Sequence, residues 1–294
     1  MSRLDAIVFR EPIHKGWSKD LKYRVVDRSG ETLLLRVTPG GNADAKRWEY
    51  EQMQQLSALG IPMCQPVEFG VCEEGVYAIQ SWIDGVELEE KLPQWDASRQ
   101  RAYGVKAGQI LRQIHSLPAP EEAKPWAIRF GRKIDKSVED YHACPIPLPS
   151  GEAFVRCIEA YRPLIENRPQ TFLHGDYHVG NMMVDSSDRL TIIDFNRAEY
   201  GDPWMEFNRI VWCAQAAPPF ASGLIDGYFG GDIPEAFWQL LALYIARNAL
   251  SSVVWAIPFG QGEIDTMLNQ ARDVLNWYDG MRSVIPGWYR KTCD

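Results

Sequence analysis

The sequence lacks a long apolar run. No stretch approaches the roughly 20 residues that a membrane-spanning helix needs. The first residues carry charges at Arg3, Asp5 and Arg10 and contain no signal-peptide core. We therefore expect a cytoplasmic protein with no membrane partner.

Cysteines spaced as in metal or redox motifs are missing as well. The Cys residues are scattered, at positions 64, 72, 144, 157, 213 and 293. This pattern predicts reduced, mostly buried thiols and argues against a disulfide framework. The net charge of -8 disfavours nucleic acid as a partner and gives a mild preference for cationic small molecules.

The length of 294 residues predicts two lobes that share a cleft. β-prone runs separated by turns predict strands at 21–26, 32–37, 67–70 and 76–83, within a five-stranded antiparallel sheet. A helix is predicted at 43–59, where Gly60 and Pro62 end it. Beyond Gly85 the periodicity becomes helical, with helices predicted at 98–116, 134–142, 152–165, 204–218, 234–256 and 262–280. We expect an α+β fold with an N-terminal nucleotide-binding lobe at 1–83 and a mainly helical catalytic lobe at 84–294.

One stretch contains the residues that are expected to take part in catalysis. The chain reads HGDYHVGN at 174–181 and IIDF at 192–195. Asp176, Asn181 five residues later and Asp194 at the end of the next apolar run have the spacing that kinase-type phosphoryl-transfer enzymes use.

The runs 182–184 and 190–193 flank a turn at 185–188 and should pair as a hairpin. Such a hairpin brings Asn181 beside Asp194. Their oxygen atoms suit a hard cation such as Mg²⁺. Asp176, in the loop ahead of the hairpin, is placed to accept or orient a substrate hydroxyl.

These two motifs resemble the catalytic signature of the aminoglycoside phosphotransferase family, which includes macrolide, choline and homoserine kinases and shares the bilobal fold of protein kinases. The resemblance implies that Asp176 is the catalytic residue, that Asn181 and Asp194 ligate Mg²⁺, and that His174 braces the loop. A zinc site at His174, Asp176 and His178 is the alternative, and it leaves Asn181 unexplained.

Arg36 is the one charge in the apolar strand 33–37, and Glu49 on the following helix is its expected partner. Kinases pair a strand Lys with a helical Glu to hold nucleotide phosphates. Here Arg stands where Lys is usual. An arginine can still bind both the Glu49 carboxylate and a nucleotide phosphate, each through two hydrogen bonds. The alternative is that Arg36 is a surface charge at a strand edge.

The resemblance also implies positions that contact the nucleotide, ATP or GTP. The loop over the phosphates would contain Gly16 and Ser18, although a Gly-x-Ser is also an ordinary turn and no GxGxxG occurs there. At the hinge, the Ser81 carbonyl and the Ile83 amide would read the adenine edge, and Gln80 would guard the back of the pocket.

The short turn Gly201-Asp202-Pro203 also resembles this family, which has no long activation segment at this point, and the resemblance favours a small-molecule acceptor over a protein. Asp202 and Glu206 are candidate acceptor-binding carboxylates for a substrate that bears amines. Asp202 is an equally good cap for the helix that follows.

The sequence therefore predicts an ATP- and Mg²⁺-dependent phosphotransferase acting on a hydroxyl of a small cationic molecule, with an aminoglycoside or related antibiotic as the leading acceptor. The alternatives are a metabolic kinase for choline, homoserine or a sugar-like acceptor, and an inactive nucleotide-binding regulatory module. A monomer and a homodimer are both compatible with the sequence.

Overall fold

The computed structural model describes residues 2–15 and 20–291. The chain forms two compact units. Unit 1 comprises Met1–Leu88 and Gly180–Asn196, and unit 2 comprises Glu89–Val179 and Arg197–Asp294. The segment 180–196 thus belongs with the N-terminal residues although it lies far along the sequence. The functional division into lobes 1–83 and 84–294 stays a prediction.

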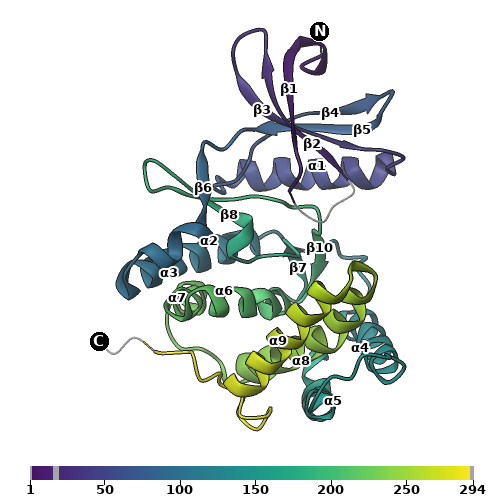
Figure 1. The fold of residues 1–294 in the computed structure, drawn as a ribbon, viewed down its shortest axis with the longest axis vertical. Coiled ribbons are helices and arrows are strands. Elements are labelled where there is room, and N and C mark those ends of the chain that lie inside the picture. The colour runs from purple at the N-terminus through teal and green to yellow at the C-terminus, as the bar shows by residue number, and fades with distance from the viewer. Residues whose placement is uncertain (1, 16–19, 292–294) are drawn as a thin grey trace. The chain divides into compact units, whose positions relative to one another are not determined.

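Unit 1 is built on an antiparallel sheet with the strand order β1-β2-β3-β5-β4. Its strands are β1 (Ile7–Ile13), β2 (Leu21–Asp27), β3 (Thr32–Thr38), β4 (Pro66–Cys72) and β5 (Gly75–Ser81), preceded by the short helix η1 (Leu4–Ala6). Helix α1 (Ala43–Ala58) packs against β4 and β5 (Figure 1). The Asn42 side chain caps α1 by accepting hydrogen bonds from two backbone amides of its first turn. The predicted five-stranded antiparallel sheet with a helix is confirmed.

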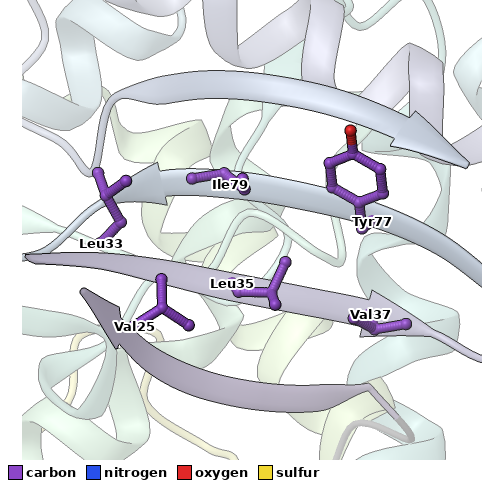
Figure 2. Close-up of a cluster of buried hydrophobic side chains, with 6 residues drawn as sticks. All are labelled: Val25, Leu33, Leu35, Val37, Tyr77 and Ile79. Carbon is purple, nitrogen blue, oxygen red and sulfur yellow. The ribbon is translucent and has the colours of Figure 1, made fainter. Parts of the chain in front are cut away.

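The alternation of apolar residues along β2, β3 and β5 explains why the sheet forms. Side chains two residues apart point to the same face of a strand. Figure 2 shows the cluster that results, formed by Val25, Leu33, Leu35, Val37, Tyr77 and Ile79. Each is at most 6% exposed, and burying such a side chain contributes about 1.5–3 kcal/mol. This cluster fixes the register of β3, and β3 carries Arg36.

The predicted hairpin of the signature is confirmed. Strand β8 (Met182–Asp185) pairs antiparallel with β9 (Leu190–Ile192), and β6 (Gly85–Glu87) pairs with β8. The Ile192 amide donates to the Pro62 carbonyl, and the Ile192 carbonyl accepts from the Cys64 amide. These bonds join the hairpin to the segment that follows α1.

Unit 2 is mainly helical. The short helices α2 (Leu88–Lys91), η2 (Leu92–Gln94) and η4 (Val179–Asn181) lie where the chain passes between the units. The other helices are α3 (Ala97–Ile114), α4 (Trp126–His142), α5 (Gly151–Tyr161), η3 (Arg162–Ile165), η5 (Pro203–Arg209), α6 (Ile210–Ala216), α7 (Pro218–Phe229), α8 (Glu235–Ala256), η6 (Ile257–Phe259) and α9 (Gln261–Trp277).

Helix α8 is the centre of unit 2 and packs against α4, α5, α9 and η5. Together with η6 it is long and apolar enough to cross a membrane, which corrects the expectation that no stretch approaches this length, but 67% of its most apolar window is buried inside the protein. Burial of this kind is what a core helix requires. Figure 1 shows α8 and α9 side by side.

Helices α3 and α7 approach each other closely because glycines line their contact. A Cβ on Gly104 or Gly108 of α3 would lie 2.1 Å from a carbonyl oxygen of α7. A Cβ on Gly223 or Gly227 of α7 would lie within 2.3 Å of a carbonyl oxygen of α3. Larger side chains would force the two helices apart.

Two helix predictions need correction. The helix expected at 134–142 begins at Trp126, directly after Pro125, and buries Trp126, Phe130 and Ile134 at four-residue spacing. The helix expected at 204–218 is η5 followed by α6, and a further helix, α7, follows where the sequence indicated none. Ala217 and two prolines break the periodicity there, which hid the start of α7.

Candidate active site

The loop of unit 2 that carries Asp176 is held by buried polar contacts. It follows β7 (Thr171–Leu173), which pairs antiparallel with β10 (Glu199–Gly201). Gly175 has a φ of 82°, and a Cβ at this position would lie 1.9 Å from the Arg197 carbonyl oxygen. Only glycine fits here. The Gly175 amide donates to both carboxylate oxygens of Glu206, at 3.0 and 3.1 Å.

His174 supports the same loop from inside. Its side chain is fully buried, and its Nδ1 accepts a hydrogen bond from the Asp176 amide at 3.2 Å. The ring also contacts Tyr177 edge-on. This placement agrees with the bracing role expected of His174, which stays a prediction.

Asp176 is surrounded by positive charge. Its carboxylate lies 3.1 Å from Arg209 Nε, 3.8 Å from Arg197 Nε and 3.8 Å from His178 Nε2. Burial would raise the pKa of Asp176. The hydrogen bond from His178 and the nearby charges of Arg209, His178 and Arg197 outweigh burial and hold the pKa well below its ordinary value. The group is therefore ionised at neutral pH.

In unit 1 the hairpin brings the two expected metal ligands together. The Ile193 amide donates to the Asn181 carbonyl at 3.0 Å. Asn181 therefore lies beside the residue that precedes Asp194. Asp194 has a φ of 68° and is 32% exposed. An amide oxygen and a partly exposed carboxylate form an oxygen-only donor set, which fits Mg²⁺.

Arg36 does not pair with Glu49, and that expectation is corrected. Arg36 Nη2 binds Asp20 Oδ2 at 2.9 Å, and Nη1 binds Asp194 Oδ1 at 3.0 Å. Glu49 instead pairs with Lys46, three residues earlier on α1, at 2.9 Å. A lysine within reach on the same helix competes for Glu49, and Asp20, brought near by β2, takes its place beside Arg36. Arg36 is only 6% exposed, so the surface-charge alternative is wrong as well.

An open pocket in unit 1 collects several of the residues expected at the nucleotide. Its lining includes Arg36, Glu49 and Gln80, together with Asp20 and Lys46. Gln80 is buried, and its Nε2 contacts Met53 Sδ at 3.4 Å. The Ser81 hydroxyl, at the end of β5, accepts from the Gln65 amide. Their roles, with that of the Ile83 amide, stay predictions, and Ser18 lies outside the described residues.

The comparison with protein families decides the identity of the chain. The model of the phosphotransferase enzyme family (APH) matches residues 10–238, most of the sequence. The chain belongs to this family. No curated protein matches it significantly.

Solved structures resemble the whole fold of this phosphotransferase. A choline/ethanolamine kinase family protein from Mesorhizobium loti superposes with a TM-score of 0.67 at 17% identity, covering 94% of this chain and 91% of that one. A mutant of aminoglycoside 2'-phosphotransferase IIIa with GDP gives 0.69 at 15% identity and covers 94% of each chain. Amicoumacin kinase hAmiN in complex with AMP-PNP, Ca²⁺ and Ami gives a TM-score of 0.65 at 13% identity, covering 96% of this chain and 90% of that one.

These matches show the protein-kinase-like fold, and the family shows the reaction class. The chain is a phosphotransferase, as the sequence predicts.

The two carboxylates expected to bind the acceptor are interior groups, and this expectation is corrected. Asp202 is 0% exposed and is bound by Arg168 and by the Tyr244 hydroxyl. Its side chain also accepts from the Trp204 amide, so the helix-capping alternative is confirmed. Glu206 is 1% exposed, and its carboxylate accepts a hydrogen bond from the Gly175 amide. Neither side chain is open to a substrate.

Sequence reasoning missed Asp20, Lys46 and Arg209. Lys46 had a signal, because it lies three residues before Glu49 on a predicted helix. Arg209 lies at the end of η5, fifteen positions after the signature's last Asp, and a charge in the Phe207-to-Val211 apolar segment was a sign that it needs a buried partner. Asp20 had no local signal.

Proposed function

We propose that this phosphotransferase moves the γ-phosphoryl group of ATP or GTP to a hydroxyl of a small molecule, with Mg²⁺ as the divalent cation. The observation that carries the proposal is the ionised, partly buried Asp176 on a loop fixed by Glu206 and His174. Kinase-type transfer relies on positioning and electrostatics, and a fixed carboxylate that receives a hydrogen bond from the acceptor hydroxyl supplies the positioning.

The low pKa of Asp176 defines how it acts. A carboxylate with a depressed pKa is a weak base, so Asp176 orients the hydroxyl and takes its proton late, when the bond to phosphorus has formed. His174 holds the loop. Arg209 and Arg197 keep the carboxylate ionised.

Asn181 and Asp194 are the residues that would hold Mg²⁺, and the bound ion supplies neutralising charge at the nucleotide phosphates. In unit 1 Arg36 fixes the Asp194 carboxylate through its 3.0 Å bond. Lys46 and Arg36 line the pocket at which nucleotide phosphates would bind. The Ser81 carbonyl, the Ile83 amide and Gln80 would contact the base.

The acceptor is an antibiotic or a metabolite. Similar structures include one with hygromycin B and AMP-PNP, at 17% identity, which supports the aminoglycoside prediction and a resistance function. The likeness to a choline/ethanolamine kinase family protein supports a metabolic kinase equally. Burial of Asp202 and Glu206 removes the residue-level argument for an amine-bearing acceptor.

The remaining expectations extend this proposal. We expect a cytoplasmic enzyme without nucleic acid or membrane partners, in keeping with its acidic net charge of -8. Activity as a monomer or as a homodimer fits the proposal.

The proposal is tested by following labelled γ-phosphate from ATP and from GTP to a panel of hydroxylated antibiotics and metabolites, with Asp176→Asn as control. The proposal is supported if phosphate is transferred to a small-molecule hydroxyl and Asp176→Asn abolishes this transfer. Labelling of an antibiotic would indicate a resistance kinase, and labelling only of a metabolite would indicate a metabolic kinase. Nucleotide binding without transfer to any acceptor would favour the regulatory module and overturn the proposal.

A further inference from the structure

A chain of three charged side chains in unit 1 ends at an expected metal ligand. Asp20, which precedes β2, accepts a hydrogen bond on Oδ2 from Arg36 Nη2 at 2.9 Å. Arg36, in β3, also donates through Nη1 to Asp194 Oδ1 at 3.0 Å. The side chains of Asp20 and Arg36 are each 7% exposed, and that of Asp194 is 32% exposed. Arg36 therefore joins an interior carboxylate to a partly accessible one.

Strand β3 holds both oxygen atoms of the Asp20 carboxylate. Thr38 Oγ1 donates to Asp20 Oδ1 at 2.8 Å, and Arg36 binds Oδ2. Arg36 and Thr38 are two residues apart in the strand, so their side chains lie on one face of the sheet. Lys46 of helix α1 approaches Asp20 Oδ2 only to 3.9 Å. The position of the Asp20 carboxylate is thus set mainly by the sheet.

The carboxylate that α1 offers to this region is bound by another cation. Glu49 pairs with Lys46 at 2.9 Å, and among the described residues Arg36 forms ion pairs with Asp20 and Asp194 alone. Burial raises the pKa of Glu49, and the nearby charges of Lys46 and Arg36 offset this rise only in part. A substitution of Glu49 should therefore leave the Arg36 guanidinium in place.

An arginine beside a metal ligand has two opposite effects on the site. Its planar guanidinium orients the carboxylate that it binds, but its positive charge repels a divalent cation. Asp20 offsets this charge from a distance of 2.9 Å. Side chains that hold a metal ligand in place typically contribute about 10- to 100-fold to metal affinity.

We infer that Asp20 and Arg36 are positioning residues for the divalent cation. Arg36 orients the Asp194 carboxylate, and Asp20 holds Arg36 and neutralises its charge so that the cation can bind. Asp20 thus takes the part that other kinases give to a helical Glu. The inference rests on the proposed function, in which Asn181 and Asp194 hold Mg²⁺.

The test measures the Kd of AMP-PNP by calorimetry with Mg²⁺ and with EDTA, so that no turnover is needed. The ratio of Kd in EDTA to Kd in Mg²⁺ reports the coupling between cation and nucleotide. Asp20→Asn leaves the Arg36 charge without its interior partner, so this ratio should fall about tenfold. The Kd in EDTA should change less than about threefold, because both Nη groups of Arg36 are bound to carboxylates rather than to the nucleotide. Equal weakening in both conditions would indicate a purely structural role and overturn the inference.

Asp5→Asn is the matched control, because it removes the same charge from an exposed position of η1 in unit 1. Its ratio should equal that of the wild type. Glu49→Gln tests the rival partner of Arg36, and its ratio should stay within about twofold of the wild-type value. A ratio that falls in Glu49→Gln but not in Asp20→Asn would show that Arg36 uses the helical acid instead.

A double-mutant cycle tests whether Asp20 acts through Arg36. The repelling charge is absent in Arg36→Gln, so adding Asp20→Asn to this variant should lower the ratio by less than about twofold. If Asp20→Asn causes the same tenfold loss with and without Arg36, Asp20 does not act through Arg36 and the inference is wrong.

The outcomes separate this inference from the proposed function. If the ratio falls as expected but no acceptor is phosphorylated, the proposed phosphoryl transfer fails while the positioning role stands. If phosphate is transferred and the ratio is the same in Asp20→Asn and the wild type, the positioning role alone fails. A wild type whose affinity for AMP-PNP does not depend on Mg²⁺ would overturn both.

Discussion

Replacing Asp202 by Asn should destabilise unit 2 without changing acceptor binding. Asp202 Oδ1 accepts from Arg168 Nη2 at 3.0 Å and from the Trp204 amide at 3.0 Å. Oδ2 accepts from Arg168 Nε at 2.7 Å and from the Tyr244 hydroxyl at 2.6 Å. The NH₂ group of Asn cannot accept, so two of these donors lose their partner and Arg168, 16% exposed, keeps an uncompensated charge.

The size of the effect follows from this loss. Removing one partner of a buried ion pair destabilises a protein by about 3–5 kcal/mol. At about 2 °C per kcal/mol for a chain of this size, the midpoint of thermal unfolding should fall by about 6–10 °C. Differential scanning calorimetry of both proteins measures the shift.

The matched control is Asp279→Asn, which removes the same charge from an exposed pair with Arg282 at 2.6 Å. Its unfolding midpoint should equal that of the wild type. An Asp202→Asn protein with an unchanged midpoint and a raised KM for the acceptor would refute the interior role of Asp202.

The remaining predictions concern the loop that carries Asp176 and the proposed metal site. Gly175→Ala should abolish transfer and lower the unfolding midpoint, because its Cβ meets the Arg197 carbonyl oxygen at 1.9 Å, whereas Gly262→Ala in α9, with open space around it, should keep full activity. The depressed pKa of Asp176 keeps it ionised from pH 5 to 9, and the stability it contributes is lost only as pH falls below about 3.9, the unfolded value, towards the folded pKa. A pH–rate profile should therefore have no acidic limb from Asp176, and a limb near pH 6 that shifts in Arg209→Lys would contradict this assignment. Asp194→Asn should raise the Mg²⁺ concentration for half-maximal transfer by about tenfold or more, since an amide replaces a charged ligand, and an unchanged Mg²⁺ titration would remove Asp194 from the metal site.

Much of the candidate site could be located from the sequence because its signals are local. Asp176, Asn181 and Asp194 lie within nineteen positions, and the hairpin between the last two follows from turn residues between two β-prone runs. The β-prone runs separated by turns likewise predicted the strands β2, β3, β4 and β5 of the sheet. Strand β1 gave no such signal, because five of its seven residues are exposed at the edge of the sheet.

What could not be predicted depends on contacts between distant residues. Arg36 was expected to pair with the nearest helical acid, yet Asp20 and Asp194, 16 and 158 residues away in sequence, take that place. The arginines near Asp176 come from η5 and from the loop after β9, and no spacing rule joins them.

The packing of α3 on α7 did leave a signal. Gly104 and Gly108, like Gly223 and Gly227, are four residues apart, a spacing that places both members of each pair on one helix face. Recognising these pairs would have revealed α7 and its partner, since close helix contact needs residues without side chains at the crossing.

Single-turnover transfer of the γ-phosphoryl group in the wild type and in Asp176→Asn, with ATP affinity measured for both, tests the central claim most directly. We predict that the first-order rate falls by about 10²–10⁴-fold, the usual contribution of a positioned acid–base group, while the Kd for ATP changes less than about threefold. A variant that transfers phosphate at the wild-type rate would contradict the assignment of Asp176 as the residue that orients the acceptor.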